Sequence, residues 1–272
     1  MQHLTLDVTS EGSAPGARLE TYIQNYSEVF ETTERPLVLV LPGGGYTHLS
    51  PREGEPMAFQ YCAMGYHAAV LYYSLAPEAT YPTQVLELAK AVALVRSHAQ
   101  EWHVDPDKII IQGCSAGAHL AALYGCIWKQ DFIAEKIGLA QENRELLKPN
   151  GQILCYPVIT SGGFAHRGSF DSFCGGDEAL ERELSVENLV NADTPKTFIW
   201  HTQTDNAVPV ENSLLMAAAL QKEHIPFELH IYPTGKHGLG LATWYTQTKG
   251  GSEVVPQCQS WIGLVKTWLE HF

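Results

Sequence analysis

Hydrophobic positions in this chain form two kinds of run: short continuous ones and longer ones with helical spacing. The short runs include Leu-Val-Leu-Val-Leu at 37–41 and Ile-Ile-Ile at 109–111. Apolar runs without alternation are typical of strands in a parallel sheet that is covered on both faces. We predict eight strands: Leu4–Val8, Leu19–Gln24, Pro36–Leu41, Ala68–Tyr73, Lys108–Gln112, Gln152–Tyr156, Lys196–His201 and Phe227–Tyr232.

The longer runs predict helices between these strands. Thr83–Trp102 repeats apolar residues at steps of three and four, and Pro82 stands just before its start. Similar segments are Ala116–Trp128, Val210–Glu223 and Val255–Phe272. Strands that alternate with helices predict an α/β fold: a doubly wound, mostly parallel eight-stranded sheet with helices on both faces. We expect one domain over residues 1–272.

Two segments interrupt the alternation of strands and helices. Residues 129–150 are polar with a helical composition, and residues 160–194 mix glycine, phenylalanine and charged residues. Long excursions of this kind often cover a functional site. We therefore expect both segments to act as lid-like insertions.

Composition and charge narrow the classes of partner. The chain has 17 Lys and Arg against 30 Asp and Glu, a formal net charge of −13. This charge argues against nucleic acid and anionic membranes as partners, and favours neutral small molecules. The first thirty residues lack a basic start followed by an apolar run, and six cysteines show no C-x-x-C spacing. We expect a cytoplasmic location, with no cofactor and no metal.

The first candidate for chemistry is Gly-Cys-Ser-Ala-Gly, residues 113–117, between the fifth strand and a helix of small residues. G-x-S-x-G is a weak motif alone, but a strand before it and a helix after it predict a nucleophile elbow. The glycines permit a tight turn, and the helix N-terminus favours negative charge beside Ser115. We expect Cys114 to point inward.

Three consecutive glycines, residues 43–45, follow the third strand. They bring no side chain, so their backbone N–H groups can approach a ligand closely. We assign an oxyanion hole to the N–H groups of Gly44, Gly45 and Ala116. A phosphate-binding loop is excluded because no Gly-Lys-Ser/Thr follows.

With these motifs the chain resembles the α/β-hydrolase superfamily, in particular small bacterial carboxylesterases and acetyl(xylan) esterases related to hormone-sensitive lipase. The resemblance rests on PGGGYTHLSPREGEP, YYSLAPEATYP, GCSAGAHLAA, PVENSL and GKHGLGLA. Pro42 stands where the better-known lipase loop begins with histidine. The resemblance implies a serine, an acid and a histidine in that chain order.

The order selects the remaining two residues. His224 ends a helix, His230 lies inside a strand and His271 lies beside the terminus, whereas His237 lies on a glycine-flanked loop after the last strand. We predict His237 as the general base. Asp205 follows the seventh strand, where its carboxylate can accept the imidazole N–H, and we predict it as the acid.

Other side chains near these motifs are candidates for the substrate pocket. Arg52 and Glu53 either pair with each other and brace the oxyanion loop or form a polar wall. Aromatic and histidine side chains could line an acyl or sugar pocket or belong to the core: Tyr46, Phe164, His166, Phe170 and Phe173.

The sequence thus predicts a serine hydrolase that cleaves short-chain esters, with acetyl groups on sugars or xylan fragments implied by the resemblance. A prolyl-type peptidase shares the order of the three residues and stays as an alternative. A hydrolase fold kept as a catalytically idle binding protein is the other. The expected partner is a small-molecule ester, and homo-oligomer formation stays open.

Overall fold

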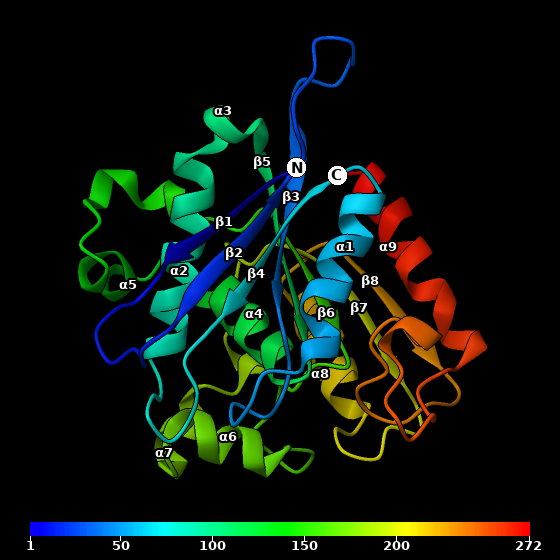
Figure 1. Ribbon diagram of the computed structural model, residues 1–272. Coiled ribbons are helices and arrows are strands. Elements are labelled where there is room, and N and C mark those ends of the chain that lie inside the picture. Colours follow the sequence, from blue (N-terminus) through cyan, green and yellow to red (C-terminus); the bar gives the residue numbers. More distant parts are fainter.

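The computed structural model describes residues 1–272 and contains one eight-stranded sheet in the order β1-β2-β4-β3-β5-β6-β7-β8 (Figure 1). The β1–β2 and β2–β4 pairs are antiparallel, and every pair from β4 to β8 is parallel. The strands are β1 (Gln2–Asp7), β2 (Arg18–Ile23), β3 (Arg35–Leu41), β4 (His67–Tyr72), β5 (Val104–Cys114), β6 (Gly151–Cys155), β7 (Lys196–Thr202) and β8 (Phe227–Tyr232).

Helices cover both faces of the sheet (Figure 1). They are α1 (Glu55–Ala63), α2 (Thr83–Ser97), α3 (Ala99–Trp102), α4 (Ala116–Ile127), α5 (Asp131–Lys136), α6 (Arg167–Cys174), α7 (Glu178–Glu183), α8 (Glu211–Lys222) and α9 (Trp261–Glu270). None of them combines the length and the apolarity needed to cross a membrane.

Alternation along the central strands explains why these runs are apolar throughout. In β3, Leu37, Leu39 and Leu41 share one core with α2, α4 and α8. Val38 and Val40 face the other way and share a second core with α1 and α9. Successive strand side chains point to opposite faces, so a sheet buried on both sides needs an unbroken hydrophobic run.

The prediction of eight mostly parallel strands is confirmed, and each strand lies within a few residues of its predicted range. The predicted helix Thr83–Trp102 is divided into α2 and α3 at His98. Helix α1 was not predicted from the sequence. The features that could have indicated it are Pro56 in the first turn and the apolar residues Met57, Ala58 and Tyr61, which are buried on one face of the helix.

The two predicted insertions lie in different places. Residues 160–194 contain α6 and α7, which lie beyond one end of the sheet (Figure 1), and His166 from this segment lines the hollow around Ser115. Residues 129–150 instead pack against α2, where Arg96 donates to the Leu146 carbonyl and to Asn150 Oδ1, both at 2.7 Å. They contribute nothing to that hollow, so the expectation that they cover the site is wrong.

Candidate active site

Ser115 lies in the sharp turn between β5 and α4. Its φ of 54° and ψ of −117° are sparsely populated by residues with a side chain, so the surrounding structure must hold them. Ser115 N donates to the Cys155 carbonyl at 2.9 Å, and the Ser115 carbonyl accepts from His119 N at 3.0 Å. A Cβ on Gly113 would lie 2.2 Å from the Gly117 carbonyl oxygen, so the turn closes only with glycine there.

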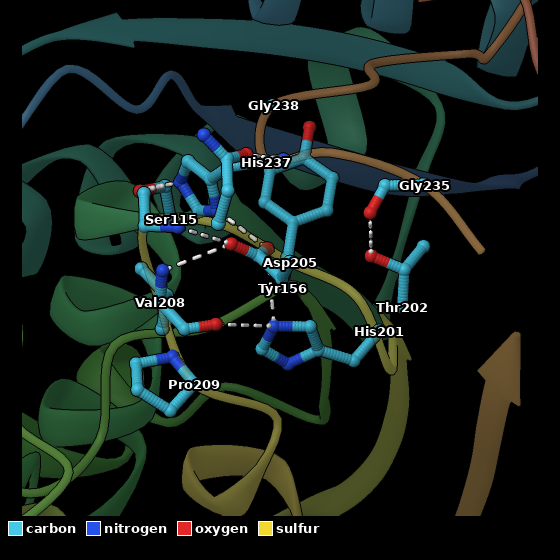
Figure 2. Close-up of polar contacts among 12 residues, drawn as sticks. Ser115, Tyr156, His201, Thr202, Asp205, Val208, Pro209, Gly235, His237 and Gly238 are labelled. Carbon is cyan, nitrogen blue, oxygen red and sulfur yellow. Dashed lines mark hydrogen bonds and ion pairs between the residues drawn. The ribbon is translucent and has the colours of Figure 1, made fainter. Parts of the chain in front are cut away.

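Ser115, His237 and Asp205 form one hydrogen-bonded chain, as the sequence predicts. Ser115 Oγ lies 2.7 Å from His237 Nε2, and His237 Nδ1 lies 2.7 Å from Asp205 Oδ2 (Figure 2). A carboxylate can only accept, so Nδ1 carries the proton and Nε2 accepts from the serine hydroxyl. The three residues follow β5, β7 and β8, whose carboxyl ends meet at the same edge of the sheet.

The Asp205 carboxylate is fully buried but accepts four hydrogen bonds. Oδ1 accepts from the N–H groups of Ala207 and Val208, both at 2.9 Å, and Oδ2 accepts from His237 and His201. Burial acts to raise the pKa of Asp205, but the hydrogen bonds from His201, His237 and the backbone outweigh it and hold the pKa well below its usual value. Asp205 is therefore ionised at neutral pH.

Further hydrogen bonds fix the two loops that carry Asp205 and His237. Thr202 Oγ1 donates to the Gly235 carbonyl at 2.8 Å (Figure 2), and His237 N donates to Asn206 Oδ1 at 3.0 Å. The Tyr156 ring lies edge-on to the His237 imidazole, with centroids 5.2 Å apart. These contacts limit the imidazole to small movements relative to Ser115.

The glycine loop leaves two backbone donors free at the edge of the hollow. The N–H groups of Gly44 and Gly45 donate no hydrogen bond within the chain, and both residues line the hollow beside Ser115. Ala116 begins α4, and the amides of a first helical turn have no acceptor within the helix. Ala116 itself does not line the hollow.

Arg52 and Glu53 do not pair with each other, which corrects one of the two expectations for them. The Glu53 carboxylate, 3% exposed, accepts from Gly43 N at 3.0 Å and from the Tyr156 hydroxyl at 2.7 Å. Arg52 donates to the carbonyls of Gly238, at 2.9 Å from Nη1, and Thr246, at 3.1 Å. Because they face different loops, Glu53 braces the glycine loop and Arg52 braces the loop of His237.

The hollow over Ser115 measures about 410 Å³, and no hydrophobic side chain lines it. Its 13 lining residues are Gly44, Gly45, Thr47, His48, Ser50, Arg52, Glu53, Ser115, His166, Lys236, His237, Gly238 and Glu253. Burial acts first to lower the pKa of His166, and the charge of His237 lowers it further. Such a lining offers many hydrogen-bond donors and acceptors.

The aromatic residues expected in this pocket lie elsewhere. Tyr46 and Phe170 are buried in the core below the hollow, so their assignment as substrate contacts is wrong. Both surround His119, whose Nδ1 lies 2.7 Å from the Tyr46 hydroxyl. Phe173 is buried with them, and Phe164 is 45% exposed but outside the lining. Cys114 is fully buried, as expected.

Lys236, Glu253 and His201 were not among the site residues predicted from the sequence. Lys236 Nζ lies 2.7 Å from Glu253 Oε1 in the wall of the hollow. Burial acts to raise the pKa of Glu253, but Lys236 and Thr248 outweigh it and lower the pKa to about 2. The third residue is His201, the second histidine on Asp205. The position of Lys236 beside His237 was the one available signal.

No group of three or more His, Cys, Asp or Glu side chains converges in a way that could hold a metal ion. The site itself presents a hydroxyl beside an imidazole, an ionised carboxylate behind the imidazole, and free backbone N–H groups in the glycine loop.

The chain is similar to known hydrolases and esterases. A family model described as BD-FAE matches residues 24–155, and one described as the prolyl oligopeptidase family matches residues 168–250. An acetyl ester-xyloside bifunctional hydrolase from Caldicellulosiruptor lactoaceticus is 36% identical and covers 98% of this chain and 96% of its own, with a TM-score of 0.81. A carboxylesterase from Lactobacillus plantarum is 28% identical and covers 99% and 96%, with a TM-score of 0.83.

The chain belongs to the α/β-hydrolase superfamily, in its carboxylesterase-like branch. Among curated relatives, an acetylxylan esterase from Xylanibacter ruminicola is 29% identical over 216 residues, 76% of this chain. Endo-1,4-beta-xylanase B from Butyrivibrio fibrisolvens is 34% identical over 236 residues, 84% of this chain. The chain spans only 42% and 36% of these two relatives, respectively.

Proposed function

We propose that this protein is a serine esterase that removes acetyl and similarly short acyl groups from hydroxyls of sugars. The observation that carries the proposal is the chain of hydrogen bonds from Ser115 through His237 to Asp205, at the edge of a hollow that no hydrophobic side chain lines. The acetyl ester-xyloside hydrolase and the acetylxylan esterase among its relatives support the substrate class.

The reaction proceeds in two halves. Ser115 Oγ attacks the ester carbonyl carbon while His237 Nε2 takes its proton, and Asp205 stabilises the imidazolium that results. The oxyanion accepts hydrogen bonds from Gly44, Gly45 and Ala116. His237 then returns the proton to the leaving alkoxide, and the alcohol departs. Water, deprotonated by His237, attacks the acyl-serine, releasing the carboxylic acid and regenerating Ser115.

The lining of the hollow argues for short acyl groups and polar alcohols. Each methylene that leaves water for an apolar pocket contributes about 0.8 kcal/mol, and no hydrophobic side chain lines this hollow to receive a long acyl chain. Arg52, His48 and Lys236 can instead hydrogen-bond to hydroxyls of the alcohol half.

A series of p-nitrophenyl esters and acetylated sugars tests the proposal. We expect kcat/KM to be highest for acetate, to fall from butyrate to octanoate, and to be lost in Ser115→Ala. A preference for octanoate would redirect the assignment to a lipase. Equal rates of the wild type and Ser115→Ala would refute serine esterase activity.

A peptidase is the second candidate, because residues 168–250 match the prolyl oligopeptidase family. Hydrolysis of an aminoacyl-proline amide compared with the acetyl ester separates the two activities. A catalytically idle binding protein would not react with a fluorophosphonate probe, whereas the esterase proposal expects covalent labelling at Ser115.

A further inference from the structure

Asp205 lies between two imidazole rings. His237 contacts its Oδ2 from the side of Ser115, and His201, from the end of β7, contacts the same oxygen from the opposite side (Figure 2). The distance from His201 Nε2 to Asp205 Oδ2 is 3.2 Å, and both side chains are fully buried. This second imidazole takes no part in the reaction described above.

The partners of His201 determine which nitrogen carries its proton. Nε2 also lies 3.1 Å from the Val208 carbonyl oxygen. A carbonyl and a carboxylate can only accept, so Nε2 must be protonated, and its N–H is shared between them. Nδ1 lies 2.8 Å from Ser213 Oγ, whose hydroxyl can donate to it from α8. The two acceptors at Nε2 thus fix the tautomer, and Ser213 supplies a partner for the other ring nitrogen.

Hydrogen bonds connect Asp205, His201 and Val208 in a closed cycle. Asp205 Oδ1 accepts from Val208 N, and His201 donates to the carbonyl of the same Val208. The carboxylate is thus held at both oxygens and cannot rotate without breaking at least one bond to a buried partner. Loss of such a partner inside a protein leaves a donor or acceptor unsatisfied.

We propose that His201 is a positioning residue: through Asp205 it sets the orientation of His237 and keeps the transferred proton on His237 rather than on the carboxylate. The inference rests on the proposed esterase function. His201 touches neither substrate nor Ser115. Its N–H withdraws electron density from the oxygen that His237 uses, so that oxygen is a weaker base.

The test compares pH profiles of kcat/KM for p-nitrophenyl acetate. In His201→Leu the carboxylate loses one donor, becomes more negative toward His237 and favours its imidazolium form. We expect the acid limb of the profile to move to higher pH and kcat to fall between about tenfold and about 10²-fold, with KM changed less than about threefold. The other titratable groups near this pair are Tyr156, beside His237, and the groups that line the hollow with His237: His48, Arg52, Glu53, His166, Lys236 and Glu253.

Conservative variants separate positioning from mere packing. His201→Gln keeps an N–H donor near Nε2, and we expect it to restore the acid limb and most of kcat. Ser213→Ala removes the hydrogen bond that holds the other nitrogen of the His201 ring, and we expect a smaller shift in the same direction. His67→Leu is the matched control: His67 is equally buried in a strand, on β4, and is bonded to Gln24 and His103 far from the site. It should lower the melting temperature without moving the profile.

The inference would be overturned if the acid limb stays in place in both His201→Leu and Ser213→Ala. The same holds if the activity of these variants falls only as much as the amount of protein that the fluorophosphonate probe labels. If His201→Leu does not fold, the other two variants test the inference. An acid limb that does not move in Ser213→Ala counts against the positioning role of His201, and so does a kcat lowered more than about tenfold in His201→Gln. Failure of the esterase proposal is distinguishable, because then the wild type and Ser115→Ala hydrolyse p-nitrophenyl acetate at equal rates.

Discussion

Replacement of Gly44 by alanine tests the assignment of the oxyanion hole most directly. Gly44 has a φ of +133°, and a Cβ there would lie 2.0 Å from the His48 carbonyl oxygen and 2.7 Å from its carbon. Both contacts are with backbone, so no side-chain rotation can relieve them, and the loop must move by roughly 1 Å to reach ordinary contact distances. The N–H of Gly44 moves with it.

The size of the effect follows from the donor that is displaced. One lost oxyanion donor raises the barrier by about 3 kcal/mol, which lowers kcat roughly 150-fold. These donors act on the charge that develops in the transition state, so KM should change little. Gly45→Ala should be milder: a Cβ there meets only Ser169 Oγ, at 3.9 Å, and the φ of +63° adds about 1 kcal/mol of strain.

The assay is steady-state hydrolysis of p-nitrophenyl acetate, with melting temperature and fluorophosphonate labelling as measures of intact protein. Gly163→Ala is the matched control, because a Cβ at Gly163 has no atom within 4 Å and its φ is not positive. Should Gly44→Ala keep kcat within about twofold of the wild type while Ser115→Ala is inactive, the oxyanion hole must be built from other donors.

Three further predictions concern the acid, the brace and the ion pair of the site. Asp205→Asn should lower kcat by on the order of 10⁴, because an amide nitrogen cannot accept from His237 Nδ1; a loss below about tenfold would argue that another group orients His237. Glu53→Gln should lower kcat more than KM, since one amide cannot accept from both Gly43 N and the Tyr156 hydroxyl; a Tyr156→Phe variant with the same defect would support the shared brace. Glu253 has a folded-state pKa of about 2 against an ordinary value of 4.5, so the stability it contributes is full above about pH 4.5 and is lost as pH falls toward 2. Lys236→Met should therefore lower the thermal midpoint at neutral pH and make its decline between about pH 4.5 and pH 2 shallower than in the wild type, because less of the shift in the pKa of Glu253 is left to be lost. Identical acid profiles of the two proteins would contradict the pairing.

The fold was predictable because the central strands are buried on both faces of the sheet and therefore have apolar residues at successive positions. A run such as residues 37–41 must be apolar at every position when alternate residues enter two different cores. The serine turn was predictable for a similar reason: Gly113 and Gly117 are imposed by backbone contacts of 2.2 Å, which the motif records directly. Constraints that act on neighbouring residues can be recognised in the sequence, because they restrict which residue types occur there.

Side-chain partners across the molecule leave no such signature. Tyr46 follows the glycine loop directly. Its neighbours in sequence do not reveal that its hydroxyl contacts His119 in the core and that its ring does not line the hollow. His201 lies within a hydrophobic strand and has the sequence context of a core residue. The partners of Arg52 and Glu53 depend on loops almost two hundred and about one hundred residues further along, respectively. These contacts exist only after the chain has folded.

Arg52 has a further consequence for how the protein matures. Its guanidinium joins the segment after β3 to carbonyls at positions 238 and 246, which are synthesised almost two hundred residues later. A nascent polypeptide that has exposed Ser115 but not yet residue 237 has a nucleophile without a base. Hydrolysis should thus begin only once residues 237 to 246 have emerged, and fragments that end before them should be inert instead of weakly active.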